Sequence, residues 1–302
     1  MALLPPVERE ARAEDLHRRR LPDDELRALV ESVVDPAATA PFGLYVFGPD
    51  EPGAALGLHV EREVFAEAFG NTPGQLDEEY RGYHHASVFA CVLDHRRRVP
   101  AGVLRFILPS AAGLKSLNDV EATWGVPFEA LFEQTGVEYD PDATWDVATL
   151  AVTPEFRAKA TGEGLVTMAL AQASSMLAGR GGGRCAVAIM DLPVLDLVQQ
   201  ALHCTLAPFA GVEARPYLDS PASVPVWGRW RDWYEVLSSA DRNLYEVICE
   251  GTGLEPVVAP PDWDAAAAQC REVIDRAAST SARRSRGADP GAGTGGGASR
   301  GR

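Results

Sequence analysis

Apolar residues recur along this chain with two different periods, which predict where helices and strands lie. Apolar positions three or four residues apart predict amphipathic helices at residues 23–34, 59–69 and 165–179. Shorter apolar runs predict strands at residues 86–94 and 101–109, joined by the polar turn 95–100, and two further strands at 144–152 and 185–191. The two periods together indicate a chain in which helices and strands alternate.

The same pattern predicts further elements. A helix at residues 128–135 ends at Gly136, because glycine readily adopts the left-handed conformation that closes helices. A helix at 193–202 begins at Pro193, where a missing N–H costs nothing. A strand, a loop and a final strand follow before residue 228. The order helix, hairpin, strand, loop, helix, strand, helix, strand predicts an α/β fold with a mixed sheet rather than a doubly wound one.

Changes in composition divide the chain into four parts. Residues 1–40 are charged and rich in Ala and Pro, and we expect an N-terminal helical extension there; residues 41–228 hold the main domain. Residues 229–276 form a C-terminal helical extension, beginning with an aromatic helix that packs on the domain or on a second copy in a homodimer. Residues 277–302 are rich in Ser, Arg and Gly, and we expect disorder there.

Charge and cysteine content exclude several classes of function. The formal net charge of −15 argues against nonspecific binding to nucleic acid or to an anionic membrane. The chain has no apolar run long enough to span a bilayer and no signal-peptide pattern, so we expect a cytoplasmic protein. The five cysteines form no CxxC pair and the clustered histidines match no ligand spacing, so no metal site is expected.

The most informative segment is 145–177, where a strand, a loop and a long helix follow one another. Such a connection gathers free backbone N–H groups and the positive end of a helix around one small volume, which favours a phosphate group. Gly162 and Gly164 let the backbone approach closely, and Arg157 and Lys159 add positive charge. The alternative is an ordinary tight connection whose glycines only permit a turn.

This loop resembles the pyrophosphate-binding loop of the GNAT superfamily of acyl-CoA-dependent N-acyltransferases. The family signature is Arg or Gln, two residues, Gly or Ala, one residue, and Gly or Ala. Arg157, Ala160 and Gly162 match it, and so do Lys159, Gly162 and Gly164, two residues later. We prefer the first register, because P-E-F-R directly after the strand is similar to the usual start of the family's loop.

A narrower resemblance, over residues 61–152, is to the acyl-homoserine-lactone synthases. An R-E-V-F helix, an acidic run before Tyr80 and Tyr83, and a strand pair ending in G-V-L-R are similar to theirs. Those enzymes have Trp-Glu-x-Ser-Arg-x-x-Val where this chain has W-D-V-A-T-L-A-V, so Ala148 and Thr149 replace the Ser-Arg pair. The chain therefore resembles a relative of that branch rather than a signal synthase.

The resemblance implies where an acyl thioester would bind. Backbone N–H groups on the strand before the loop would hold the thioester carbonyl, and the loop would hold the diphosphate of acyl-CoA or acetyl-CoA. The candidate residues for this role are Leu150, Ala151, Val152, Arg157, Ala158, Lys159, Ala160, Thr161, Gly162 and Glu163.

Asp146 is the candidate catalytic base, because it stands where the family has glutamate; it would act through water. The alternative is a solvated carboxylate at the start of a strand. Strand alternation predicts that Asp146, Ala148 and Leu150 share one face, and that the other face carries Trp145, Val147 and Thr149.

Four other residues are candidates for roles at the site. Arg105 is a candidate ligand for a substrate carboxylate, with a surface ion pair as the alternative; Asp191 faces the substrate cleft or caps the helix that follows it. The later helix has no tyrosine to protonate the departing thiolate, which leaves His203 or Cys204.

We therefore expect an acyltransferase that moves an acyl group from acyl-CoA, or from an acyl carrier protein, to the amine of a small molecule or amino acid. The alternative is a catalytically inactive GNAT-like protein that binds a ligand or a protein partner. The missing tyrosine and the altered Ser-Arg pair favour the alternative.

Overall fold

The computed structural model describes residues 21–158 and 164–287, and for 280–287 only the backbone. The strands form at the apolar runs of the sequence, and all the strands predicted above are confirmed. They are β1 (Phe42–Phe47), β2 (Ser87–Asp94), β3 (Val99–Ile107), β4 (Thr144–Val152), β5 (Cys185–Asp191), β6 (Ala207–Pro208), β7 (Arg215–Tyr217), β8 (Ser220–Arg229) and β9 (Val258–Ala259). The sequence pattern did not predict β1, whose unbroken apolar run has no alternation.

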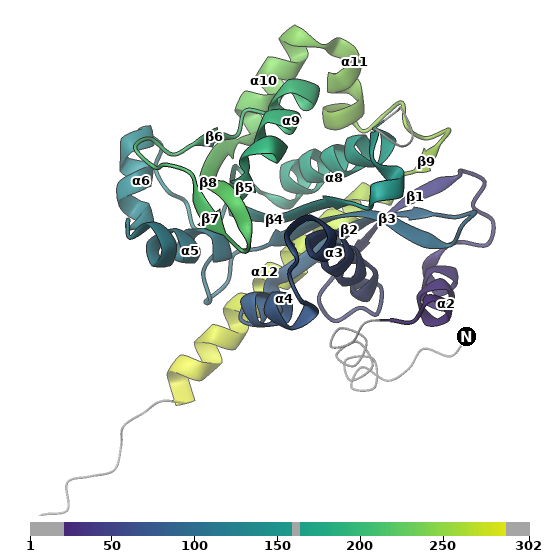
Figure 1. Ribbon diagram of the computed structural model, residues 1–302, viewed down its shortest axis with the longest axis horizontal. Coiled ribbons are helices and arrows are strands. Elements are labelled where there is room, and N and C mark those ends of the chain that lie inside the picture. Colours follow the sequence, from purple (N-terminus) through teal and green to yellow (C-terminus); the bar gives the residue numbers. More distant parts are fainter. Residues whose placement is uncertain (1–20, 159–163, 288–302) are drawn as a thin grey trace, which may run out of the picture.

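These nine strands form one sheet, in the order β6–β8–β5–β4–β3–β2–β1–β9, with β7 paired to β8 beside that path. The pairs β4–β5 and β1–β9 are parallel, and the other pairs are antiparallel. The predicted α/β fold with a mixed sheet is therefore confirmed (Figure 1).

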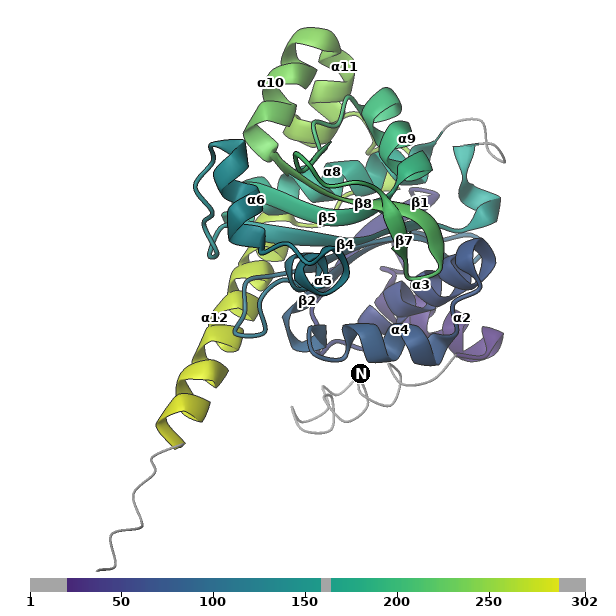
Figure 2. The same cartoon turned by 60° about the vertical axis from the view of Figure 1, so that its left-hand side comes forward.

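Helices cover both faces of the sheet (Figure 2). One face carries α8 (Leu165–Gly181), α9 (Leu192–Leu202), α10 (Trp230–Ala240), α11 (Arg242–Tyr245), a π-helical turn (Glu246–Glu250) and α12 (Trp263–Gly287). The other face carries α2 (Asp23–Val33), α3 (Ala54–Phe69), α4 (Pro73–Tyr80), α5 (Lys115–Trp124) and α6 (Phe128–Thr135). Short 3-10 turns at His84–Ala86 and Pro154–Phe156 complete the described elements.

The C-terminal helices pack on the domain itself. Trp230, Leu237, Ile248 and Cys270 are buried in the same apolar cluster as α8. The segment 229–250, expected as one aromatic helix, is divided into α10, α11 and the π-helical turn. The helix expected at 263–276 continues to Gly287, so its last turns lie in the segment expected to be disordered.

The remaining helices follow the pattern only in part. In α2 the predicted apolar face is confirmed, since Leu26, Leu29 and Val30 are buried, and α6 ends at Gly136 with φ +70° as predicted. The helices α4 and α5 were not predicted. None of the helices in the described ranges is long and apolar enough to cross a membrane.

Candidate functional site

The two parallel strands at the middle of the sheet separate part-way along their length. Their paired register comprises Thr144, Trp145 and Asp146 of β4, opposite Cys185, Ala186 and Val187 of β5. Beyond these residues β4 continues to Val152 beside β3, and β5 continues to Asp191 beside β8. The separation leaves an opening between the carboxyl ends of β4 and β5, where open α/β sheets commonly bind their ligands.

A cavity of about 900 Å³ occupies this opening. Its walls come from both faces of the sheet: Phe65 and Ala68 belong to α3, whereas Leu170 and Ser174 belong to α8. Most of the lining is apolar. The further apolar contributors from α9 and α10 are Val194, Leu197, Val198, Ala201, Leu202, Trp230 and Trp233. The cavity therefore passes between the two strands and connects the two layers of helices.

Several residues predicted to bind the thioester line this one cavity. They are Leu150, Ala151 and Val152 at the end of β4, and Arg157 and Ala158 after it. Lys159, Ala160, Thr161, Gly162 and Glu163 lie outside the described residues. Of the two registers of the loop signature, only Arg157 of the first and Gly164 of the second are described. The segment between β4 and α8 therefore lines the cavity at both of its ends, at Arg157 and Ala158 after the strand and at Gly164 before the helix.

Some amides between β4 and α8 are already paired within the protein. The N–H groups of Thr153, Phe156 and Arg157 donate to the carbonyls of Ala101, Thr153 and Pro154. The side chain of Arg157 turns back, since Nε donates to the carbonyl of Val152 at 3.0 Å and Nη2 lies 2.6 Å from Glu67. In the described part of this stretch, the first turn of α8, which begins at Leu165, has backbone N–H groups without partners inside the helix.

Asp146 lies behind the cavity rather than in its wall. Its carboxylate is fully buried, and both oxygens accept hydrogen bonds at 2.7 Å from Ser116, one from the backbone N–H and one from the hydroxyl. Burial raises the pKa of Asp146 to about 6, although the two bonds from Ser116 oppose that rise. The solvated alternative is therefore wrong, and the carboxylate closes the N-terminus of α5, whose own N-cap, Leu114, provides no side-chain bond.

A β-bulge in β4 changes which residues share a face. Arg105 of β3 pairs with Thr149 and Phe106 pairs with Val147, so Ala148 is the extra residue. Because a bulge shifts the alternation by one, Leu150 joins Trp145 and Val147 in the α8 layer. Thr149 instead turns to α3, where its hydroxyl donates to Glu61 at 2.6 Å. The predicted faces are therefore wrong beyond the bulge.

Arg105 is fully buried, so the surface ion pair considered for it is wrong. Its Nη1 lies 3.1 Å from a carboxylate oxygen of Glu61, and its Nε donates to Ser87 at 3.0 Å. The guanidinium carbon lies 4.0 Å from the centre of the Tyr80 ring. Arg105 is not among the residues that line the cavity, and Tyr80 is.

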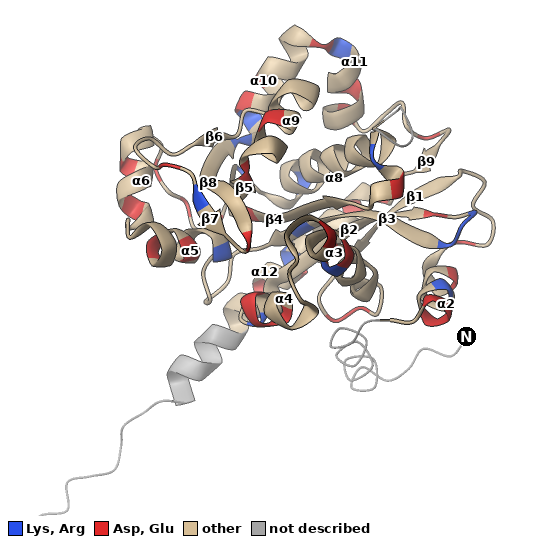
Figure 3. Cartoon of the chain, in the orientation of Figure 1, with Lys and Arg blue, Asp and Glu red and all other residues tan. Residues whose placement is uncertain are grey.

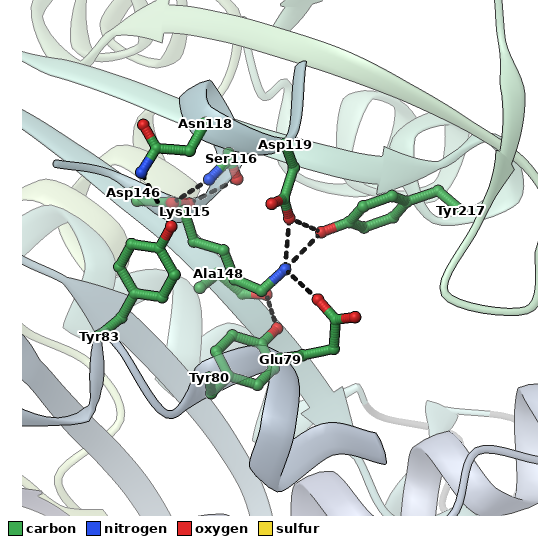
Figure 4. A network of polar contacts seen from close by, with 10 residues as sticks. All are labelled: Glu79, Tyr80, Tyr83, Lys115, Ser116, Asn118, Asp119, Asp146, Ala148 and Tyr217. Atoms are coloured by element: carbon green, nitrogen blue, oxygen red, sulfur yellow. Dashed lines mark hydrogen bonds and ion pairs between the residues drawn. The ribbon is translucent and has the colours of Figure 1, made fainter. Parts of the chain in front are cut away.

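The cavity has one polar end, close to the bulge and built from α4, α5 and β7 (Figure 4). The ammonium of Lys115 lies 3.1 Å from Glu79, donates to Tyr217 at 2.8 Å, and pairs with Asp119. Burial alone would lower the pKa of Lys115, but Tyr80, Asp119 and Glu79 outweigh it and raise that pKa. The Tyr80 hydroxyl donates to the carbonyl of Ala148 at 3.2 Å.

Lys115, Tyr80 and Tyr217 were not assigned roles from the sequence, although they line the site. Tyr80 belongs to the run that resembles the acyl-homoserine-lactone synthases, which is a usable signal. Lys115 and Tyr217 meet only through folding, because about a hundred residues separate them and no local pattern links them.

Asp191 lines the cavity, which is one of the two positions considered for it, and it is also the N-cap residue of α9. Its side chain makes no cap bond there; its carboxylate instead accepts a hydrogen bond from the Ser220 hydroxyl. Cys204 lines the cavity, whereas His203 stands in the left-handed conformation at the end of α9 and outside the lining. Burial raises the pKa of Cys204 to about 11, so its thiol is protonated at neutral pH.

In the described residues, no group of three His, Cys, Asp or Glu side chains could hold a metal ion.

No protein-family model matches the chain, and no curated protein matches its sequence. Among solved structures, it is similar to the CoA-dependent acyl-homoserine lactone synthase BjaI with SAM and isopentyl-CoA, at 16% identity over 76% of this chain and 98% of that one, with a TM-score of 0.47. It is also similar to FeeM, an N-acyl amino acid synthase from uncultured soil microbes, at 13% identity over 65% and 95%, with a TM-score of 0.43. A third is an acetyltransferase of the GNAT family from Desulfovibrio desulfuricans, at 16% identity over 63% and 99%, with a TM-score of 0.38. These structures include both groups that the sequence motifs resemble.

Proposed function

We propose that this protein transfers an acyl group, longer than acetyl, from acyl-CoA to an amine, in the cavity between β4 and β5. The observation that carries the proposal is the separation of these two strands beyond Asp146 and Val187. The opening joins an apolar space to a polar end, and it lies beside the strand end where a thioester carbonyl would be held.

The end of β4 suits the thioester carbonyl. Successive N–H groups of a strand point to opposite sides, and β5 has left one side of β4 at Leu150, Ala151 and Val152. At least one of these three amides therefore points into the opening, where it stabilises negative charge on the carbonyl oxygen. The N-terminus of α8 reaches the same cavity at Gly164 and suits the phosphates, whereas the guanidinium of Arg157 is paired with Glu67.

The apolar part of the cavity suits an acyl chain. Leu170, Val198 and Trp233 contribute to it from three different helices, and its volume far exceeds that of an acetyl group. Each methylene moved from water into such a space contributes about 0.8 kcal/mol. A donor with a medium or long chain would therefore bind more tightly than acetyl-CoA.

The polar end suits the amine. The neutral nitrogen attacks the thioester carbon, a C–N bond forms, the C–S bond breaks, and the proton lost by nitrogen ends on the thiol. Cys204, Tyr80 and Tyr217 are all protonated at neutral pH, because burial raises each pKa. Each of the three can therefore give a proton to the departing thiolate, although Tyr80 and Tyr217 would first release their hydrogen bonds to Ala148 and Asp119.

The donor is more consistent with CoA than with a carrier protein of negative charge. The net charge is −15, and Figure 3 shows acidic residues on the helices of both layers. An acidic carrier would meet long-range repulsion, which salt reduces.

A second candidate is an acyl-thioester-binding protein without turnover. The geometry of Asp146 favours it, because both carboxylate oxygens are held by Ser116 and neither lines the cavity. A base would then have to come from another group.

Release of free thiol separates the two candidates. Decanoyl-CoA is mixed with the protein and a panel of amines, and thiol release above the amine-free rate is measured. We expect release that depends on the amine, with acyl-CoA preferred over the same chain on a carrier protein. Tight binding of decanoyl-CoA without amine-dependent release would favour the non-catalytic candidate, and an absence of binding would contradict both.

A further inference from the structure

The polar end of the cavity has a hydrogen-bonding pattern that restricts what it can bind. Seven lining residues carry its polar side-chain hydrogens: Lys115, Tyr80, Tyr217, Ser116, Thr149, Ser220 and Ser223. The hydroxyl of Thr149 donates to Glu61 at 2.6 Å. A lysine ammonium has three hydrogens to donate, and each hydroxyl has one. Whether these hydrogens are already used decides whether the site attracts hydrogen-bond donors or acceptors.

The ammonium of Lys115 has used all three of its hydrogens. Its partners are Glu79 at 3.1 Å, Tyr217 at 2.8 Å, and Asp119. Its side chain is only 3% exposed, so it has no room to exchange these partners for a ligand. Lys115 therefore does not provide a donor for a substrate carboxylate.

The hydroxyl groups around Lys115 are committed in the same way. Tyr80 donates to the carbonyl of Ala148, and Tyr217 donates to Asp119. Ser116 donates to Asp146.

The two remaining serines donate in sequence, Ser223 to Ser220 and Ser220 to Asp191. The Nη2 group of Arg105 is buried without a hydrogen-bond partner among the described residues, but Arg105 is not one of the lining residues. What the lining offers is therefore oxygen lone pairs.

The charges agree with this pattern. At the polar end, Lys115 contributes one positive charge, and its partners Glu79 and Asp119, just outside the lining, contribute two negative ones. Asp191 adds a negative charge in the lining itself. Arg157 and Arg229 also line the cavity, and each is paired with a carboxylate, of Glu67 and Asp232. A ligand that donates hydrogens and carries positive charge is the complement of such a site.

We infer that the acyl acceptor is an alkyl or arylalkyl amine that carries no carboxylate, bound as an ammonium ion by the oxygens around Lys115 and Tyr217 before it loses one proton to solvent. This inference rests on the proposed function and names its acceptor class. The bulge at Ala148 brings the bound nitrogen close to the thioester, since Leu150 is only two residues, about 7 Å, farther along β4.

Matched pairs of ligands test the inference by equilibrium binding to the full chain loaded with decyl-CoA, a thioether that cannot transfer its chain. The pairs are 1,5-diaminopentane against L-lysine, and tyramine against L-tyrosine, because each pair differs only by a carboxylate. We expect each amine to bind at least about tenfold more tightly than its amino acid. Equal or tighter binding of the amino acids, or no binding of either amine, would overturn the inference.

A charge-removing variant locates the effect. Glu79→Gln keeps an oxygen for Lys115 but removes one negative charge, so the preference for the amine should fall roughly fivefold. The control is Glu78→Gln, because Glu78 is exposed and pairs with Arg81. An unchanged preference in Glu79→Gln would contradict the assigned place. Amine binding without any thiol release would leave the inference standing and remove the proposed reaction instead.

Discussion

At the scale of single residues, Asp146 joins the fold to the site. Its buried carboxylate fixes Ser116 at the start of α5, and the neighbouring Lys115 holds the polar end of the cavity together. Burial raises the pKa of Asp146 to about 6 from an ordinary value of 3.8. The folded state therefore holds a proton that the unfolded chain has already lost between these two pH values.

This difference predicts how stability depends on pH. A group whose pKa is raised in the folded state contributes stability that is full below pH 3.8 and is lost as pH rises through about 6. The loss is about 3 kcal/mol, since one pKa unit corresponds to about 1.4 kcal/mol.

Asp146→Asn should abolish this part of the pH dependence, as measured by urea unfolding between pH 4 and pH 7. The control is Asp142→Asn, at an exposed position of the same segment. Curves for Asp146→Asn and the parent protein that stay parallel across this range would contradict the raised pKa. The same variant tests the predicted base: a loss of thiol release of about a hundredfold, at a pH where the variant is still fully folded, would support that role.

The cavity-lining residues near the end of β4 could be predicted from the sequence, whereas those at the polar end of the cavity could not. Leu150 and Arg157 belong to a continuous segment whose strand and helix periods are visible. Lys115 and Tyr217 come from elements that pair only in three dimensions, so local pattern could not reveal their contact.

At the scale of elements, the close approach of α8 to β3 sets the shape of the cavity. A Cβ atom at Gly102 would lie 2.6 Å from Cγ1 of Val166 and 3.1 Å from the carbonyl oxygen of Ala151. Val166 belongs to the first turn of α8 and is buried. Glycine at this position therefore lets the start of α8 lie against β3, beside the end of β4.

Gly102→Ala should lower the free energy of unfolding by about 1–3 kcal/mol, because the added methyl group overpacks this contact. It should also weaken decanoyl-CoA binding, because the first turn of α8 must move.

Gly74→Ala is the control of opposite sign: a Cβ there meets nothing within 4 Å, and alanine in α4 should stabilise by about 0.5–1 kcal/mol. Thermal unfolding and calorimetry measure both effects, and a Gly102→Ala protein of unchanged stability and affinity would refute the account of this contact.

Element positions were more predictable than the faces they present. The bounds of β4 and β5 follow from their apolar runs, yet the bulge at Ala148 depends on how β3 pairs with β4, and alternation alone cannot detect it. The helix α12 passed its predicted end because Ser and Arg residues are compatible with a helix that is already anchored by Cys270 and Val273.

At the scale of the whole molecule, the cavity depends on parts distant in the sequence. Trp230 and Trp233 of the C-terminal helices close it on one side, and Phe65 of α3 closes it on the other. The sequence predicted the mixed sheet, but the opening forms only where the pairing of β4 with β5 stops at Asp146. The point at which β4 and β5 stop pairing depends on how the helices pack on the sheet, so the local sequence pattern could not predict it.

The central claim is that the opening between β4 and β5 holds the acyl chain of a CoA thioester. Titration calorimetry of decanoyl-CoA and of CoA tests it most directly, with the parent protein, with Ser174→Trp on the cavity wall, and with Ser238→Trp at an exposed position of α10 as the control. We predict that decanoyl-CoA binds at least about tenfold more tightly than CoA, and that only Ser174→Trp removes this difference. Equal affinities for the two ligands, or a difference that Ser174→Trp leaves intact, would contradict the account.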